Sequence, residues 1–325
     1  MNRQESIDIP IIETRGLKKY FKVRDGFLHA VDNVNITIPA NKTLGVVGES
    51  GCGKSTLGRT IIRLLDATDG EVFYKGENIL KSKKRQCQEM QIIFQDPYAS
   101  INPRMSVVEI IAEYMIVNKT CSSKTEAFQR AAELMDVVGL ARRYANSYPH
   151  ELDGGRRQRI GIARALSLNP KFIVCDEPVS ALDVSIQAQI LNLLMDIQEE
   201  KGLTYMFITH DLSVVKHISD EIVVMYLGQC VEQAPSDELF DTPLHPYTKA
   251  LLAAIPEPSI EMRKKEITLL KGEVISPINP KPGCRFAARC EFTKDICRVE
   301  TPILREQSER HFVACHMFAE SDIKE

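Results

Sequence analysis

The sequence predicts an α/β domain with a mixed, largely parallel core sheet, followed by a small C-terminal extension. Three observations lead to this prediction. Short apolar segments with strand character alternate with segments of helical periodicity, as expected when helices connect parallel strands. A glycine-rich loop joins one such strand to one such helix. After Pro256-Glu257-Pro258, proline, cysteine and charged residues become frequent.

The individual elements follow from local patterns. We expect strands at residues 43–48, 91–94, 172–177, 204–210 and 221–226, and helices at 54–65, 106–138, 155–168, 185–200 and 212–219. Two more strands, at 11–23 and 33–39, flank the turn-forming pair Asp25-Gly26. The change in character places a domain boundary at residue 258, with a main domain at 1–258 and an extension at 259–325.

Composition excludes several classes of protein. The 325 residues carry a net charge of −3, so general electrostatic adhesion to nucleic acid is not expected. No apolar run approaches the roughly 18 residues of a membrane span, and the N-terminus lacks the apolar core of a secretory signal. We therefore expect a cytoplasmic protein whose nine cysteines are reduced thiols or metal ligands.

A phosphate-binding loop is the most specific motif. GESGCGKST follows an apolar strand and begins a helix, which is the context that confirms the G-x-x-x-x-G-K-[ST] pattern. Its backbone N–H groups and the helix N-terminus favour an anion. We expect Lys54 to reach the β- and γ-phosphates and the Ser55 hydroxyl to bind Mg²⁺. The residues expected to bind ATP are Gly48, Ser50, Gly51, Cys52, Gly53, Lys54, Ser55 and Thr56.

FIVCDEP (Phe172–Pro178) supplies the second half of such a site. Four apolar residues form a buried strand that ends in two acids. Asp176 is expected to hold Mg²⁺ directly or through water, and Glu177 to polarise the attacking water or act as its base.

Six motifs in order make residues 11 to about 256 resemble the ATPase subunit of an ABC transporter. They are the phosphate loop, FQDP with Gln95, ELDGGRRQR, CDEP, SALD and ITHD. The resemblance implies a P-loop NTPase fold of ABC type, with an inserted helical subdomain at about 96–168 that docks onto transmembrane partners. It also implies a head-to-tail dimer in which the signature segment of each subunit covers the ATP held by the other.

The signature departs from the family's usual L-S-G-G-Q pattern. It consists here of Leu152, Asp153, Gly154, Gly155 and Arg156. The two glycines expose N–H groups at a helix start, which suits an anion. A carboxylate beside the γ-phosphate costs ~4 kcal/mol at a separation of ~4 Å and an effective dielectric of ~20. We therefore expect Asp153 to turn away, be protonated or be neutralised, with Arg156 one turn on as a partner.

Other residues acquire roles through the resemblance. Gln95 would contact Mg²⁺ or the water, and His210 would hold the γ-phosphate and orient Glu177. Asp183 would lie at the dimer interface. Of the two aromatic residues in LKKYF, Phe21 is preferred over Tyr20 for stacking on adenine.

The extension contains a spaced set of cysteines. Cys284, Cys290, Cys297 and Cys315 follow the pattern C-x5-C-x6-C-x17-C. The upstream LHPYTKALLAAIP resembles the start of the extension in the oligopeptide/dipeptide and nickel importers, in which tail cysteines can ligate a [4Fe–4S] cluster. Four thiolates suit an Fe–S cluster or Zn²⁺, and free thiols are the third alternative. His311 and His316 are expected at the surface of the tail.

The resemblance implies the ATP-hydrolysing subunit of a peptide importer, with a nickel importer as the alternative. Its partners would be a second ATPase subunit in a heterodimer, two permease subunits and an extracytoplasmic binding protein, with this chain peripheral at the cytoplasmic face. Two other readings stay open. One is a regulatory subunit with weak hydrolysis because of the LDGGR signature. The other is a soluble DNA-repair or chromosome ATPase, against which the lack of coiled-coil heptads and of a basic face argues.

Overall fold

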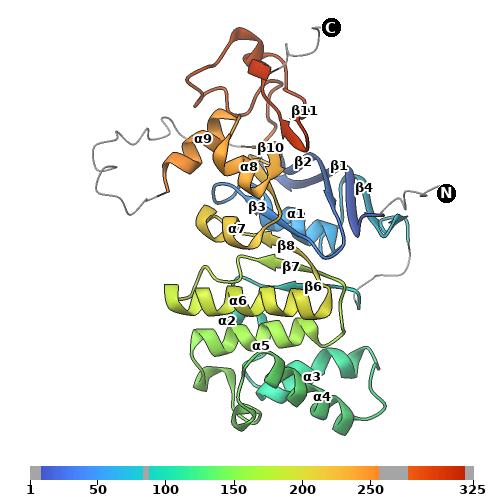
Figure 1. The fold of residues 1–325 in the computed structure, drawn as a ribbon. Helices are drawn as coiled ribbons and strands as arrows, with labels where there is room; N and C mark the ends of the chain where they lie inside the picture. Colours follow the sequence, from blue (N-terminus) through green and yellow to red (C-terminus); the bar gives the residue numbers. More distant parts are fainter. Residues whose placement is uncertain (1–8, 83–87, 256–276, 319–325) are drawn as a thin grey trace, which may run out of the picture.

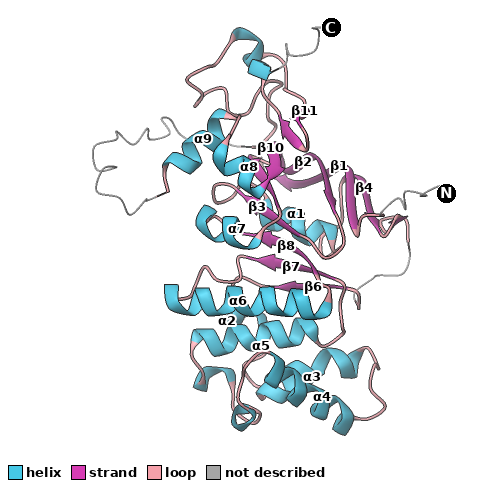
Figure 2. Ribbon diagram, in the orientation of Figure 1, coloured by secondary structure: helices cyan, strands magenta, loops and turns pink. Residues whose placement is uncertain are grey.

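The computed structural model describes residues 9–82, 88–255 and 277–318. These residues form two sheets with helices around them (Figure 2), and the C-terminal extension, red in Figure 1, lies beside the N-terminal strands, blue in the same figure. The boundary expected at residue 258 lies outside the described residues.

The larger sheet has the strand order β11-β12-β10-β9-β3-β8-β7-β6 in the described part of the chain. Strands β6, β7, β8, β3 and β9 are parallel, whereas β10, β12 and β11 are antiparallel to their neighbours, so the predicted mixed sheet is confirmed. The bounds are β3 Thr43–Val47, β6 Met90–Ile93, β7 Phe172–Asp176, β8 Thr204–Ile208, β9 Glu221–Tyr226, β10 Gln229–Pro235, β11 Arg305–Ser308 and β12 His311–Val313.

The second sheet is antiparallel, with the order β2-β1-β4-β5. Its strands are β1 Ile12–Val23, β2 Gly26–Ile38, β4 Asp69–Tyr74 and β5 Glu77–Asn78. The expected turn at Asp25-Gly26 is present, but β2 begins there rather than at residue 33. Register shifts along β1 and β2 disturb the alternation of apolar and polar residues, which explains why the sequence pattern did not reveal the full strand.

The predicted helices are present close to their expected positions, and three short helices, α2, α8 and α9, were not predicted. The helices are α1 Lys54–Ile61, α2 Pro97–Ser100, α3 Val107–Val117, α4 Lys124–Val137, α5 Gly154–Leu166, α6 Val184–Lys201, α7 Leu212–Ile218, α8 Ser236–Asp241 and α9 Pro246–Ala253. Helix α1 ends four residues before the predicted end at residue 65, and the backbone turns left-handed at Arg63 (φ 59°). The predicted helical region at 106–138 is two helices, interrupted where Lys119 has φ 54°.

Strand β7 separates two apolar layers. Phe172 and Val174 pack with residues of α1 and the antiparallel sheet, whereas Ile173 and Cys175 pack with the helices on the other face. Figure 1 accordingly shows α1 on one side of strands β6–β8, and α5 and α6 on the other. The helix after the phosphate loop and the helix that begins with the glycine pair therefore belong to different layers of the molecule.

The extension returns to the core sheet. Strand β12 pairs with β10, and the Ala314 N–H donates to the Val231 carbonyl at 2.8 Å. His311, expected at the surface, is instead only 1% exposed. Its two ring nitrogens lie 2.8 Å from Glu232 and 3.1 Å from Glu238, and these two carboxylates explain how a polar ring can be buried there.

Among the described residues, no helix combines the length and apolar character needed to cross a bilayer.

Candidate nucleotide-binding site

The phosphate loop lies between β3 and α1, as predicted. Gly53 precedes α1 with φ 106°, and a Cβ there would lie 1.9 Å from the Ala30 carbonyl oxygen. Gly48 has φ 150°, and a Cβ there would lie 2.2 Å from the Met225 carbonyl oxygen. Only glycine fits these two close approaches, so the glycine spacing follows from the packing of the loop against β2 and β9.

Lys54 is held within the loop. Its ammonium donates to the Gly48 carbonyl at 2.7 Å and to the Glu49 carbonyl at 3.0 Å, and the residue is 4% exposed. Cys52 is also buried, and burial raises the pKa of its thiol above the ordinary value. A neutral buried thiol has little nucleophilic or redox reactivity, so Cys52 contributes as a small packed residue.

Two predicted magnesium residues lie in contact. The Ser55 hydroxyl donates to Asp176 at 2.5 Å, and Asp176 is fully buried at the end of β7. Arg59, which sequence reasoning missed, reaches the other oxygen of Asp176 at 3.0 Å. Its position four residues after Ser55, on the same face of α1, was the available signal. A hydroxyl beside a carboxylate fits Mg²⁺, which binds one or two protein oxygens and keeps several waters.

The remaining catalytic candidates converge on Glu177. Gln95 donates to Glu177 at 2.9 Å, and the His210 ring nitrogen Nδ1 lies 3.3 Å from the same oxygen. The three residues follow β6, β7 and β8, whose carboxyl ends meet at one edge of the parallel sheet. Glu177 has φ 48°, and its N–H donates to the Ile208 carbonyl at 3.0 Å. A non-glycine residue in this conformation costs of order 1 kcal/mol and is typical of functional sites.

The signature segment forms the start of α5. Asp153 is its N-cap: one carboxylate oxygen accepts from the Arg156 N–H at 2.8 Å, and the other pairs with the Arg156 guanidinium at 2.5 Å. The structure thus provides the neutralising partner expected for Asp153. The glycine pair also has a packing reason, because a Cβ at Gly154 would lie 3.2 Å from Leu182, and one at Gly155 would lie 2.8 Å from Ile186.

Two family models match the chain. Residues 31–180 match the model described as ABC transporter, and residues 231–297 match the model of the oligopeptide/dipeptide transporter C-terminal region. A putative oligopeptide transport ATP-binding protein of Bacillus subtilis, YkfD, is 51% identical over 98% of both chains. The oligopeptide transport ATP-binding protein OppF of Escherichia coli is 50% identical over 94% of this chain and 95% of that protein.

The chain belongs to the ATP-binding proteins of ABC transporters. Solved structures agree with this family. A dimeric bacterial ABC transporter cassette has a TM-score of 0.64 at 29% identity, covering 69% of this chain and 98% of that one. CbiO1 of Clostridium perfringens, part of an ABC transporter complex, also has a TM-score of 0.64, at 26% identity, covering 72% and 91%.

The arginines of α5 in this ABC ATPase are bound within the chain. Arg157 donates to the Pro149 carbonyl at 2.7 Å, and Arg159 donates to the Val138 carbonyl at 2.5 Å. Arg164 donates to the Ser100 carbonyl at 2.5 Å. These contacts attach α5 to the surrounding helical segments.

The two candidates for adenine stacking differ in their contacts. The Tyr20 ring stacks on His29 with centroids 3.8 Å apart, and its hydroxyl donates to Asp32. The Phe21 ring is partly exposed near the end of β1, with the Lys19 ammonium 5.0 Å from its centroid. Tyr20 is therefore committed to internal contacts, which favours Phe21 as the stacking residue.

The four extension cysteines lie in one region of the ABC ATPase. Burial, and then the neighbouring thiols of Cys297, Cys315 and Cys290, raise the pKa of Cys284 to about 11. The Cys284 N–H also donates to the Cys297 carbonyl at 2.7 Å. Nevertheless, the described residues include no group of three or more cysteine, histidine or acidic side chains arranged to hold a metal ion. The structure therefore gathers the thiols without forming a ligand set.

Proposed function

We propose that this chain is the ATP-binding and ATP-hydrolysing subunit that powers import of oligopeptides or dipeptides across the cytoplasmic membrane. The observation that carries the proposal is the convergence of Gln95 and His210 on Glu177, beside the contact of Ser55 with Asp176. The match of the extension to the oligopeptide/dipeptide model and the names of the relatives support a peptide cargo rather than nickel.

The chemistry follows from these positions. The phosphate loop would hold the phosphates of ATP through its N–H groups and Lys54, with Phe21 on adenine. Ser55, Asp176 and Gln95 would hold Mg²⁺, which neutralises developing phosphate charge. Glu177 would polarise the water that attacks the γ-phosphorus, and His210 would hold the γ-phosphate while fixing the orientation of Glu177.

We further propose that the complete site needs a second ATPase subunit. The signature of this chain, Leu152–Arg156, would cover ATP bound to the partner, with the exposed Asp183 at the same interface. The layer arrangement supports this assignment, because β6–β8 separate α5 from the phosphate loop helix α1 of the same chain. We propose a heterodimer, in which a partner with the usual serine at the position of Asp153 would make the two composite sites unequal.

The remaining partners complete an importer. The helical subdomain at about 96–168 would dock on two permease subunits at the cytoplasmic face of the membrane, and an extracytoplasmic binding protein would select the cargo. We place the domain boundary at residue 258. The ATPase domain, residues 1–258, would couple to the permeases, and residues 259–325 would form the extension. No nucleic-acid partner is proposed.

The cargo is tested by reconstitution. Proteoliposomes that contain this chain, its partner ATPase, the permeases and the binding protein should take up a labelled oligopeptide only with internal MgATP. The Glu177→Gln variant of this chain is the matched control and should abolish most of that uptake. Uptake of nickel in place of peptide would establish the alternative cargo.

We propose that Cys284, Cys290, Cys297 and Cys315 hold a [4Fe–4S] cluster. The donor chemistry supports this, since four nearby thiols suit a sulfur-ligated centre that braces a segment with little core of its own. Protein purified without oxygen should contain about four irons and four sulfides per chain, following from the cluster formula. Cys290→Ser should lose both. Zinc, or no metal, would contradict the cluster while leaving the ATPase proposal intact.

A further inference from the structure

We propose that Arg285 and Arg289 of the extension are positioning residues for nucleotide binding. In this proposal the extension sets the affinity of the phosphate loop for MgATP through two ion pairs. The inference rests on the proposed ATPase function and concerns the same site. Both arginines lie in the short segment Cys284–Cys290, whose sequence is CRFAARC.

Arg289 holds the phosphate loop directly. Its guanidinium binds both carboxylate oxygens of Glu49, at 2.7 and 3.0 Å, and its side chain is only 6% exposed. Glu49 is the second residue of the phosphate loop. A bidentate arginine–carboxylate pair fixes geometry as well as charge, so Arg289 determines where the Glu49 backbone lies.

Glu49 in turn contacts Lys54. The Glu49 carbonyl accepts from the Lys54 ammonium at 3.0 Å, and the Glu49 N–H donates to the Tyr247 hydroxyl at 2.9 Å. Phe286 of the same segment is 2% exposed and packs its ring against Tyr226 and Tyr247, with centroids 5.3 and 5.4 Å apart. Residues outside the loop therefore fix Glu49 and its surroundings. Arg289 holds its carboxylate, the Tyr247 hydroxyl accepts from its N–H, and Phe286 packs against the Tyr247 ring.

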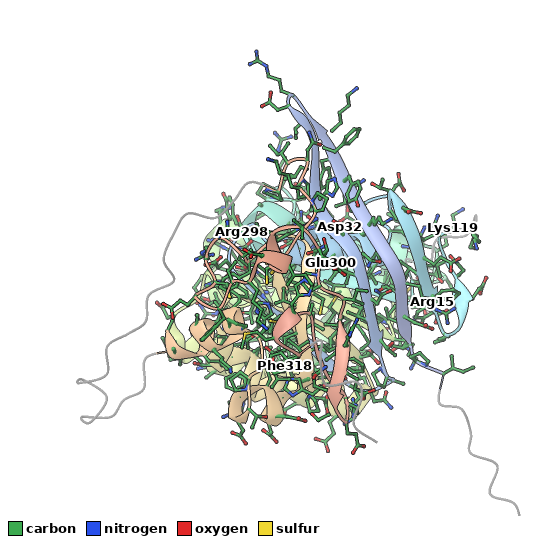
Figure 3. The ribbon with its side chains drawn as sticks, turned by 90° about the horizontal axis from the view of Figure 1, so that it is seen from above. Arg15, Asp32, Lys119, Arg298, Glu300 and Phe318 are labelled. Carbon is green, nitrogen blue, oxygen red and sulfur yellow. The ribbon has the colours of Figure 1, made fainter. Side chains whose placement is uncertain are left out.

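Arg285 holds the other side of the site. Its guanidinium donates to Asp32, which also accepts from the Tyr20 hydroxyl, and to the Leu227 carbonyl. The next residue, Gly228, donates its N–H to the Cys52 carbonyl of the phosphate loop at 2.8 Å. Asp32 lies where the extension meets strands β1 and β2 (Figure 3). Arg285 thus connects the extension to the β1 segment that carries Phe21 and to the phosphate loop.

A third ion pair provides a matched control. Arg310 also joins the extension to the core, through Glu221 at 2.9 Å. Glu221 pairs with Leu44 at the start of β3, at the opposite end of the strand from the phosphate loop. Breaking this pair should loosen the extension without moving Glu49. A variant that breaks the Arg310–Glu221 pair therefore distinguishes an effect on the position of Glu49 from a general loosening of the extension.

The experiment measures the dissociation constant for MgATP and the free energy of unfolding of the full chain. Arg289→Ala and Glu49→Gln should each weaken MgATP binding by about fivefold or more, at the lower end of measured couplings between sites. The double variant should bind no more weakly than the worse single variant, because both changes break one interaction. Arg285→Ala should weaken binding as well. Arg310→Ala should keep the wild-type dissociation constant.

Three results would overturn the inference. One is wild-type MgATP affinity in a folded Arg289→Ala variant; a second is additive effects of Arg289→Ala and Glu49→Gln. The third is equal losses in Arg310→Ala and Arg289→Ala, which would reduce the arginines to general attachment. Failure of the wild-type chain to bind MgATP would instead overturn the proposed function along with the inference. Arg289→Lys keeps the charge, and its partial recovery of affinity would support positioning through Glu49.

Discussion

Asp153 keeps the helix-capping role of the serine in the usual signature but adds a negative charge at the helix start. Aspartate caps a helix as well as serine does, and Asp153 accepts the Arg156 N–H at 2.8 Å. It also places a carboxylate at the helix end proposed to face the γ-phosphate of the partner's ATP. Pairing with Arg156 reduces the repulsion, but the carboxylate and guanidinium remain 57% and 43% exposed, so the pair is open to solvent.

Substitutions of Asp153 and of its partner Arg156 should have opposite effects on nucleotide binding. Asp153→Ser should tighten nucleotide binding at the composite site by about two- to fivefold, since exposed charges contribute about 1 kcal/mol or less. Arg156→Ala should weaken binding by a similar factor, because it removes the partner and leaves the carboxylate. ATP affinity and turnover in the assembled transporter measure both. Unchanged values for both variants would show that Asp153 does not face the nucleotide.

At the scale of elements, the glycine pair joins α5 to α6. A Cβ at Gly155 would lie 2.8 Å from Ile186, whereas at Gly161, in the same helix, nothing outside the helix lies within 4 Å. Gly155→Ala should therefore lower the free energy of unfolding by about 1–3 kcal/mol through overpacking. Gly161→Ala should raise it by about 0.5–1 kcal/mol through helix propensity. Chemical denaturation measures both, and a stabilising Gly155→Ala would contradict the packing account.

The attachment of β12 to the core depends on a buried histidine. Burial alone would lower the pKa of His311, but hydrogen bonds to Glu232 on β10 and Glu238 on α8 raise it above its ordinary value. In contrast, burial lowers the pKa of nearby His245 to about 4, so His245 stays neutral over the pH range in which His311 titrates. The protonated His311 therefore stabilises the folded extension below its unfolded pKa of about 6.5, and this contribution is lost as the pH rises through the raised folded value.

The free energy of unfolding should accordingly fall as the pH rises above about 6.5, and more steeply for the wild type than for a His311→Gln variant. Glutamine keeps a hydrogen-bond donor but does not titrate. The measurement is urea denaturation at several pH values. Identical pH profiles for the two proteins would show that His311 is neutral throughout, contrary to the pairing with two carboxylates.

Across the whole molecule, the features that the sequence predicted are those encoded by residues close together in the chain. Alternating strands and helices, the phosphate loop and the acids after β7 all depend on residues close together in the chain, and the structure places them as expected. The antiparallel strands β4, β5, β10, β11 and β12 were missed, because their pattern is short or irregular. The contact between Arg289 and Glu49 joins residues 240 positions apart, and a separation of that length leaves no local pattern.

The candidate site was predictable for a related reason. Gln95, Glu177 and His210 each follow a parallel strand within two residues, and the carboxyl ends of such strands lie at one edge of the sheet. The approach of His210 to Glu177 was expected from the family resemblance, whereas the contacts of Gln95 with Glu177 and of Arg59 with Asp176 were not. The burial of His311 could not be foreseen either, because its partners Glu232 and Glu238 lie in other elements.

We propose that this chain supplies a hydrolytic half-site of the ATPase dimer rather than a regulatory one. The most direct test is MgATP hydrolysis by the assembled transporter in which the partner's own catalytic glutamate has been replaced, so that turnover reports this chain's phosphate loop. Glu177→Gln should then lower turnover by about 100-fold or more, as expected for loss of a general base, while MgATP binding is kept. Equal turnover with Glu177 and with glutamine would contradict the account and establish this chain as a regulatory nucleotide-binding subunit.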